Sequence, residues 1–160
     1  MNGLFLGKSG NGKGVFAGRG FRKGEAIMEF RGKLFTLRQL PFPYESVEDR
    51  YVQIGKYLYM GPSGGIDDFF NHSCSPNAGL VVSGRKAVLI AIKNISKGSE
   101  VTWDYSTTMD EDDWELDCRC GSRACRGRVR DFKRLPKRTR ESYIRLGIVP
   151  KYILKKEKHL

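Results

Sequence analysis

The chain of 160 residues has no long hydrophobic run. Its longest aliphatic stretch, Ala87 to Ile92, is six residues long, far short of the roughly 20 that a membrane-spanning helix needs. The first thirty residues mix Lys and Arg with many glycines and lack the continuous apolar segment of a secretory signal. We therefore expect no transmembrane segment, no membrane partner and an intracellular location.

Histidine and cysteine are scarce, with two and four residues. His72 is the one histidine away from the C-terminus, and a lone histidine is more often a hydrogen-bonding core residue than a ligand. The hydrophobic share of 39% is well above that of a disordered chain, so a packed core is expected. The length supports one domain with an appendage.

Acidic residues are few in the C-terminal part. Residues 126–160 carry 13 Lys and Arg against 3 Asp and Glu, whereas residues 1–125 carry 16 against 15. The formal charge of +11 therefore lies almost wholly in a basic tail. Such a tail is typical of nucleic-acid contact, an acidic partner, a nuclear-import signal or a solvated helix face, and charge does not separate these.

Glycine is abundant instead, and its 19 residues are scattered between short apolar stretches, which predicts tight turns between short strands. The predicted strands are Gly14 to Ala17, Ala26 to Arg31, Tyr51 to Ile54, Tyr57 to Met60, Leu80 to Val82 and Lys86 to Ile92. Only Thr36 to Arg50 and Lys137 to Leu146 have a helical pattern, and two prolines interrupt the first. The body is predicted to be mainly β.

A glycine-rich segment near the N-terminus is similar to a phosphate-binding loop but lacks two of its parts. Gly7 to Lys13 reads G-x-x-x-x-G-K, yet Gly14 stands where a Ser or Thr hydroxyl would hold magnesium. Only six residues precede it, and no long crossover helix follows. We interpret the segment as a glycine-rich turn whose backbone can approach a ligand closely.

The four cysteines have a spacing that favours a metal site. Cys118, Cys120 and Cys125 form C-x-C-x4-C, and Cys74 lies in an N-H-S-C tetrapeptide. Four thiolates complete a tetrahedral structural zinc site and leave no position for water or substrate. A disulfide framework would require an oxidising compartment, for which the sequence carries no signal. The alternative is four unrelated free cysteines.

Three further segments stand in a fixed order ahead of the cysteine cluster. They are Gly12-Lys13-Gly14-Val15-Phe16-Ala17, Asn71-His72-Ser73-Cys74-Ser75-Pro76-Asn77 and Gly98-Ser99-Glu100-Val101-Thr102-Trp103-Asp104-Tyr105. With the cysteines, which match a post-SET cluster, they resemble the SET-domain protein lysine methyltransferases over roughly residues 3 to 127. The heptapeptide and the cysteine spacing are specific, whereas the glycines alone would be a weak signal.

The resemblance implies a mainly β fold of small curved sheets with a pseudoknot. The segment around Tyr105 would thread beneath the loop that carries Asn71 and His72, an arrangement that pattern alone does not reveal. Residues 1–117 would form the SET domain, with a variable insert at about 36–65. A zinc-stapled post-SET segment over 118–127 and a basic, partly helical C-terminal extension over 128–160 would follow.

The resemblance also implies S-adenosylmethionine as methyl donor. The residues expected to bind it are Gly12, Lys13, Gly14, Tyr51, Asn71 and His72. The glycine segment would act through backbone groups, and Asn71 and His72 would bind the amino-acid and adenine portions. Tyr51 stands where the family usually places another aromatic contact; the alternative is a strand aromatic packed in the core.

Tyr105 is the expected catalytic residue, because its phenol would orient the substrate amine near the transferring methyl group. Phe30 and Trp103 are expected to line the substrate channel. Phe30 lacks the hydroxyl that many members of the family have there, and Trp103 is larger than the usual Phe or Tyr. A lysine amine, with an ordinary pKa of about 10.4, must lose its proton first, and an apolar channel beside a sulfonium lowers that pKa.

We therefore expect a SAM-dependent protein lysine N-methyltransferase with a structural zinc, acting on a histone or another basic protein. DNA or nucleosome contact through the basic tail is a second expected interaction, with a nuclear or chromatin location in a eukaryote. The alternative is a catalytically silent SET scaffold that binds chromatin or nucleic acid. The acidic residues between 104 and 117 would either attract a basic peptide or neutralise the basic tail.

Overall fold

Short strands make up most of the regular structure in the computed structural model, which describes residues 3–40, 50–112 and 114–157. The strands are β1 (Leu4–Ser9), β2 (Gly12–Ala17), β3 (Ala26–Glu29), β4 (Leu34–Thr36), β5 (Val52–Gly55), β6 (Leu58–Met60), β7 (Ala78–Ser83), β8 (Lys86–Ala91), β9 (Leu116–Asp117) and β10 (Arg128–Val129). The helices are η1 (Leu37–Gln39), η2 (Ile66–Phe69), η3 (Tyr105–Thr107), η4 (Phe132–Arg134), α1 (Lys137–Arg145) and α2 (Lys151–Glu157), of which only the last two are α-helical. Within the described ranges, no helix is long and apolar enough to span a membrane.

The described strands pair into small antiparallel sheets. β7 and β8 form a hairpin, and β3 adds to the other edge of β8. A second sheet has the order β4-β6-β5, while β1 pairs with β2 and β9 with β10. The predicted architecture of small sheets in a mainly β fold is therefore confirmed.

The β7–β8 hairpin lies between two apolar clusters. Leu80 and Leu89 belong to the main core, whereas Val81 and Ile90 pack against the C-terminal segment. Successive side chains of a strand point to opposite faces, so a strand covered on both sides needs apolar residues at every position. This requirement accounts for the continuous aliphatic run from Ala87 to Ile92.

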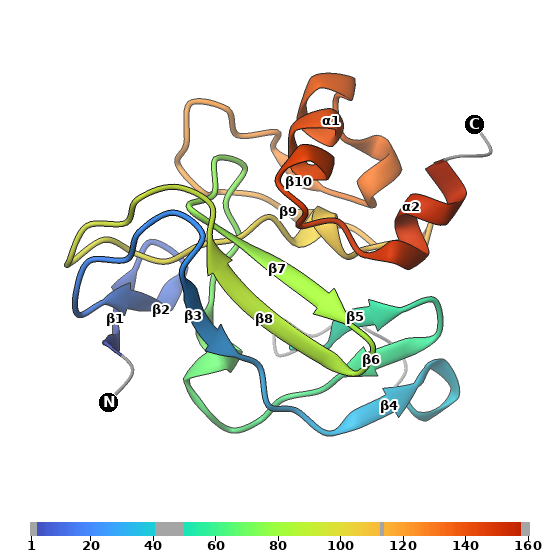
Figure 1. Cartoon of the computed structure of the whole chain (residues 1–160), viewed down its shortest axis with the longest axis horizontal. Coiled ribbons are helices and arrows are strands. Elements are labelled where there is room, and N and C mark those ends of the chain that lie inside the picture. The colour runs from blue at the N-terminus through green and yellow to red at the C-terminus, as the bar shows by residue number, and fades with distance from the viewer. Residues whose placement is uncertain (1–2, 41–49, 113, 158–160) are drawn as a thin grey trace.

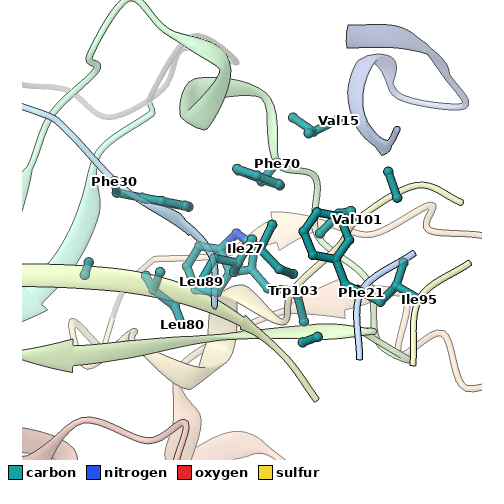
Figure 2. Packing of buried hydrophobic residues seen from close by; sticks show 14 of the residues in the cluster. Val15, Phe21, Ile27, Phe30, Phe70, Leu80, Leu89, Ile95, Val101 and Trp103 are labelled. Carbon is teal, nitrogen blue, oxygen red and sulfur yellow. The ribbon is translucent and has the colours of Figure 1, made fainter. Parts of the chain in front are cut away.

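The main core joins the N-terminal hairpin to the central sheet. Val15, Phe21 and Leu89 are at most 1% exposed. Figure 2 shows the ring of Phe30 beside that of Phe70, with Trp103 beneath them near Ile27 and Leu89. These residues come from segments far apart in the chain, so the core fixes the position of the 70–77 loop relative to the 100–105 segment.

The C-terminal segment has its own apolar cluster and packs on the body. Its buried members are Phe132, Leu135, Tyr143, Ile148, Val149 and Ile153. In Figure 1, α1 and α2 lie on one side of the β7–β8 hairpin. The basic tail is thus amphipathic, with an apolar side turned to the sheet and most of its described cations exposed.

Several predicted elements differ from the structure. The predicted helix over Thr36 to Arg50 is wrong at its start, where β4 ends at Thr36 and only the short η1 follows; residues 41–49 lie outside the described ranges. The helix at Lys137 to Leu146 is confirmed as α1. The sequence pattern does not predict β1, β4, β9, β10 and α2. These elements are short or, in β1, partly exposed on both faces, so their periodicity is weak.

Candidate active site

The candidate site forms where two distant segments run side by side. His72 and Trp103 make a parallel bridge. The Ser73 amide donates to the Trp103 carbonyl at 3.0 Å, and the Trp103 amide donates to the Asn71 carbonyl at 3.2 Å. The Asn77 side chain extends this pairing, since its amide donates to the Glu100 carbonyl at 2.7 Å. These bonds place the 100–105 segment beside the loop that carries Asn71 and His72; the threading of the segment around Tyr105 beneath that loop stays a prediction.

Tyr105 is held at both ends by the segment that it pairs with. Its amide donates to His72 Nδ1 at 3.2 Å, and its phenol donates to the Phe70 carbonyl at 2.8 Å. Burial raises the pKa of the Tyr105 phenol far above its ordinary value. The phenol is therefore protonated at neutral pH, and its oxygen can still accept a hydrogen bond from a second group.

His72 is buried and neutral. Burial lowers its pKa to about 4. Because Nδ1 accepts the Tyr105 amide, the ring proton lies on Nε2, which is 3.3 Å from Cys74 Sγ. Asp104 Oδ1 lies 3.5 Å from Nδ1, but the two groups do not form an ion pair because the imidazole is neutral. The imidazole is thus engaged by the protein through both nitrogens.

The Tyr105 ring packs at the end of a row of aromatic rings, here called the aromatic wall. Trp103 lies 4.9 Å from it between centroids, and Phe30 packs edge-on against Trp103 at 6.4 Å. Phe30 also stacks on Phe70 at 5.6 Å. Phe30 and Trp103 are 6% and 3% exposed, so the two predicted channel residues do meet beside Tyr105 and are largely covered.

The β1–β2 hairpin brings its glycines to the same region. The Asn71 side-chain amide donates to the Lys13 carbonyl at 3.0 Å and to Glu100 Oε1 at 2.7 Å. A Cβ on Gly14 would lie 2.3 Å from that Glu100 oxygen and 2.9 Å from the Asn71 amide nitrogen, so a side chain there would displace this pair. Gly12 has a φ of 99° and open space where a Cβ would stand, which leaves its backbone accessible.

Two cations flank the ring of Phe69 next to this hairpin. Lys13 Nζ lies 5.8 Å from the ring centroid and Arg50 Cζ lies 4.4 Å from it. Tyr51, the neighbour of Arg50, packs edge-on against Phe35 at 5.4 Å. Tyr51 is partly buried and directly precedes β5, and both its contact with a cofactor and its alternative, packing in the core, stay predictions.

The four cysteines come together as predicted, and the alternative of four unrelated thiols is wrong. Their sulfur atoms all lie within 4.8 Å of one another, and Cys118 Sγ is 3.7 Å from those of Cys74 and Cys125. Zinc–sulfur bonds of about 2.3 Å in a tetrahedron place the sulfurs about 3.8 Å apart. Burial raises the pKa of Cys74 and Cys118, whereas hydrogen bonds outweigh burial at Cys120 and lower its pKa to about 6. The donor set and its spacing fit zinc.

The acidic residues between 104 and 117 are largely paired with the basic tail. Arg128 and Arg130 each lie 2.8 Å from a carboxylate oxygen of Glu115, and Lys133 pairs with Asp112. Asp113 lies outside the described ranges. Of the two interpretations of this segment, neutralisation of the tail is therefore the one that the described contacts favour.

Two acidic residues of the 98–105 segment, Glu100 and Asp104, make contacts in the site that the sequence motifs did not predict. Glu100 holds the Asn71 amide, and Asp104 is 1% exposed and accepts a hydrogen bond from Arg126 at 2.8 Å. A signal was present in the sequence, because Glu100 and Asp104 stand next to the apolar Val101 and Trp103, and a charged residue is rarely buried unless it is paired. Arg126 follows the last cysteine directly, which was a further signal.

Comparison with protein-family models matches residues 12–106 to the SET domain. Since this match spans more than half of the chain, the protein belongs to the SET-domain family. The cysteine segment and the C-terminal helices lie beyond the matched range.

Relatives by sequence are named as histone-lysine methyltransferases. The chain is 32% identical over 133 residues to "Histone-lysine N-methyltransferase set-2" of Caenorhabditis elegans, a match that covers 73% of this chain and 8% of that protein. It is 34% identical over 131 residues to "Histone-lysine N-methyltransferase, H3 lysine-4 specific" of Saccharomyces cerevisiae, covering 71% of this chain and 12% of that protein. The chain thus spans only a small part of the length of these relatives.

Solved structures share the fold. The methyltransferase domain of human SETMAR superposes with a TM-score of 0.65 at 22% identity, covering 80% of this chain and 58% of that chain. KRYPTONITE in complex with mCHG DNA and SAH also gives 0.65, at 24% identity, covering 79% of this chain and 29% of that chain. The predicted SET fold is confirmed.

Proposed function

We propose that this chain is a SAM-dependent protein lysine N-methyltransferase that acts on a histone or another basic protein. The observation that carries the proposal is the placement of Tyr105. Its phenol donates to the Phe70 carbonyl, and its ring packs against Trp103. Tyr105 also ends the segment that pairs with Asn71, and the Asn71 side chain donates to Lys13 of the glycine hairpin. The names of the relatives support the same reaction class.

The cofactor site would be formed by Gly12, Lys13, Gly14, Tyr51, Asn71 and His72. The fit rests on the open backbone at Gly12, the Asn71 amide beside the Lys13 carbonyl, and the cations of Lys13 and Arg50 on Phe69. These cations match the carboxylate of an amino-acid moiety. When bound, S-adenosylmethionine supplies a methyl group on a cationic sulfonium. His72 would contribute through its main chain, because both ring nitrogens already contact protein atoms.

The residues around Tyr105 would prepare the substrate amine. Phe30, Trp103 and the Tyr105 ring form apolar surroundings that disfavour an ammonium and so lower the pKa of an entering lysine. The Tyr105 oxygen would accept a hydrogen bond from the amine while its own O–H donates to the Phe70 carbonyl. Because its raised pKa keeps the phenol protonated at neutral pH, Tyr105 would not act as a general base. Its role would be to orient the amine. Phe30 adds no polar contact.

The zinc site would be held by Cys74, Cys118, Cys120 and Cys125 and is structural, because the four thiolates fill a tetrahedral shell. It joins the loop of the cofactor site to the segment after Tyr105. On this proposal the chain divides into a SET domain at 1–117, a post-SET segment at 118–127 and a basic extension at 128–160.

Cofactor binding and methyl transfer test the proposal together. Calorimetric titration should detect S-adenosylmethionine binding, and a radiolabelled methyl group should pass to mixed histones. Asn71→Ala should weaken binding, whereas Asn94→Ala, whose side chain only accepts from the Lys23 amide among the described contacts, should not. Absence of cofactor binding together with tight DNA binding would establish the alternative of a silent scaffold.

DNA contact through the C-terminal extension is a second proposed interaction. Lys56, Lys151 and Lys155 line one cavity of about 990 Å³ beside α2, while Lys133, at the same cavity, pairs with Asp112. Such accessible cations suit phosphate groups, and one structural neighbour was solved with DNA. In a eukaryotic cell, histone and DNA contacts would place the protein at chromatin in the nucleus.

Charge reversal tests this contact. Replacing Lys151 and Lys155 by Glu should weaken binding to a short duplex and reduce the slope of affinity against salt by about two. The matched control is the reversal of Lys23 and Lys86, two exposed lysines elsewhere on the surface. Equal loss in both double variants would show that net charge alone, and no local site, governs binding.

A further inference from the structure

Asp104 is a buried carboxylate held by groups from two later parts of the chain. Its side chain is inaccessible to solvent. Oδ1 accepts from the Ser106 amide at 3.1 Å and from the Arg126 guanidinium at 2.8 Å. Oδ2 accepts from the Tyr143 hydroxyl at 3.0 Å. A buried carboxylate is costly unless it is paired and hydrogen-bonded, so these contacts determine where Asp104 can lie.

The position of Asp104 determines that of Tyr105. The two are neighbours, and Asp104 caps the short helix η3 that begins at Tyr105. The Asp104 carbonyl accepts from the Thr107 amide at 3.0 Å and from its hydroxyl at 2.7 Å. A displacement of the Asp104 side chain would therefore reach the Tyr105 amide, which donates to His72.

Tyr143 approaches Asp104 from α1, which the C-terminal apolar cluster holds against the β7–β8 hairpin (Figure 1). Its ring is 5% exposed and belongs to that cluster. Burial, and then the Asp104 carboxylate, raise the pKa of the Tyr143 phenol, so that it remains a hydrogen-bond donor at neutral pH. Arg126 approaches from the cysteine segment, where its amide donates to Cys74 Sγ at 3.4 Å.

We propose that Tyr143 is a positioning residue for the methyl transfer: through Asp104, the C-terminal helix α1 sets the orientation of the η3 turn and hence of the Tyr105 hydroxyl. The extension is then part of the active site's support as well as a basic surface. This inference rests on the proposed methyltransferase function.

Tyr143→Phe tests the proposal, because it removes the hydroxyl and keeps the ring that packs in the cluster. We expect kcat to fall by about tenfold, the scale of one lost hydrogen bond to a charged group, with the KM for a histone H3 peptide and the Kd of S-adenosylmethionine within twofold of wild type. In the amide spectrum recorded by NMR, the Tyr105 resonance should shift.

Tyr152→Phe is the matched control. Its hydroxyl, in α2, donates to the Gln53 carbonyl at 3.1 Å and to the Thr108 carbonyl at 2.5 Å, and it makes no described contact with Asp104. A comparable loss of thermal stability is expected, with kcat and the Tyr105 resonance close to wild type. Because Tyr152 reaches the C-cap of η3 without touching Asp104, equal kinetic effects of the two variants would overturn the positioning role assigned to the Tyr143–Asp104 bond.

The outcomes separate this inference from the proposed function. Wild-type kcat and an unchanged Tyr105 resonance in Tyr143→Phe would overturn the inference while leaving the methyltransferase proposal intact. An inactive wild-type protein would overturn the proposed function and, with it, the kinetic role of Tyr143. In that case the NMR shift would still decide whether Tyr143 controls the position of Tyr105.

Discussion

Tyr105 is positioned by groups 33 and 35 residues earlier in the chain, namely the His72 ring and the Phe70 carbonyl. The sequence motifs predicted that Tyr105 and Asn71 lie close together, because the heptapeptide and the segment that ends at Tyr105 are specific to one family. They could not predict the bonds of Asp104 to Arg126 and Tyr143. Hydrogen-bond partners of a carboxylate depend on tertiary packing, which leaves no periodic trace in sequence.

Tyr105→Phe removes one oxygen from the site and keeps the aromatic wall. We expect kcat to fall by on the order of 100-fold, since the amine loses the group that orients it. The Kd of S-adenosylmethionine should change little, because the hydroxyl bonds to the Phe70 carbonyl and to no predicted cofactor residue. Steady-state kinetics and calorimetry measure the two quantities.

Tyr57→Phe is the control for this change, because Tyr57 is 59% exposed and its hydroxyl has no described partner in the site. Its kcat should equal that of the wild type. Retention of full activity in Tyr105→Phe would remove Tyr105 from the mechanism.

The cysteine cluster gives a prediction that is independent of activity. Metal analysis should find one zinc per chain, and Cys120→Ser should lower that content, because an alcohol is a far weaker zinc ligand than a thiolate. The unfolding midpoint should fall as well, since the metal joins the Cys74 loop to residues 118–125. Ser75→Ala, an exposed change beside Cys74, serves as control. A metal-free native protein would contradict the zinc assignment.

The strands and helices differ in how far sequence predicts them. The β7–β8 hairpin was predictable, because an aliphatic run follows a Gly-containing turn at Gly84, whose φ is 61°. The short β9 and β10 were not, because they have two residues each and form only when the chain reverses around the cysteines. α2 was not predictable either, because it is short and its apolar residues become buried only through tertiary contacts. They pack in one cluster with residues of the β7–β8 hairpin and with Phe132.

The packing of the C-terminal segment yields a stability prediction. Ile148 is 1% exposed and packs directly on Gly79. A Cβ added to Gly79 would lie 2.5 Å from Ile148 Cγ2. Ile148→Ala should lower the free energy of unfolding by about 2–5 kcal/mol, the usual cost of such a cavity. Ile144→Ala, at a position 39% exposed on α1, should cost much less. Urea denaturation measures both, and equal losses would show that the segment does not pack on the sheet.

Charge gives a different picture of the whole molecule once the fold is known. The excess of +11 is concentrated in residues 126–160, but these residues are not a separate basic arm. Their apolar side packs on the central sheet, part of their cations neutralise Asp112 and Glu115, and Arg126 and Tyr143 reach Asp104. Composition could indicate only a basic tail, because charge counts do not record which side of a helix is buried.

The central claim is that this folded chain transfers methyl groups to lysine side chains. Mass spectrometry of mixed histones, incubated with the protein and S-adenosylmethionine that carries a deuterated methyl group, tests it most directly. We expect deuterated methyl groups on histone lysines with the wild-type chain and their near-complete loss with Tyr105→Phe. Histones without label, or equal labelling by both proteins, would contradict it.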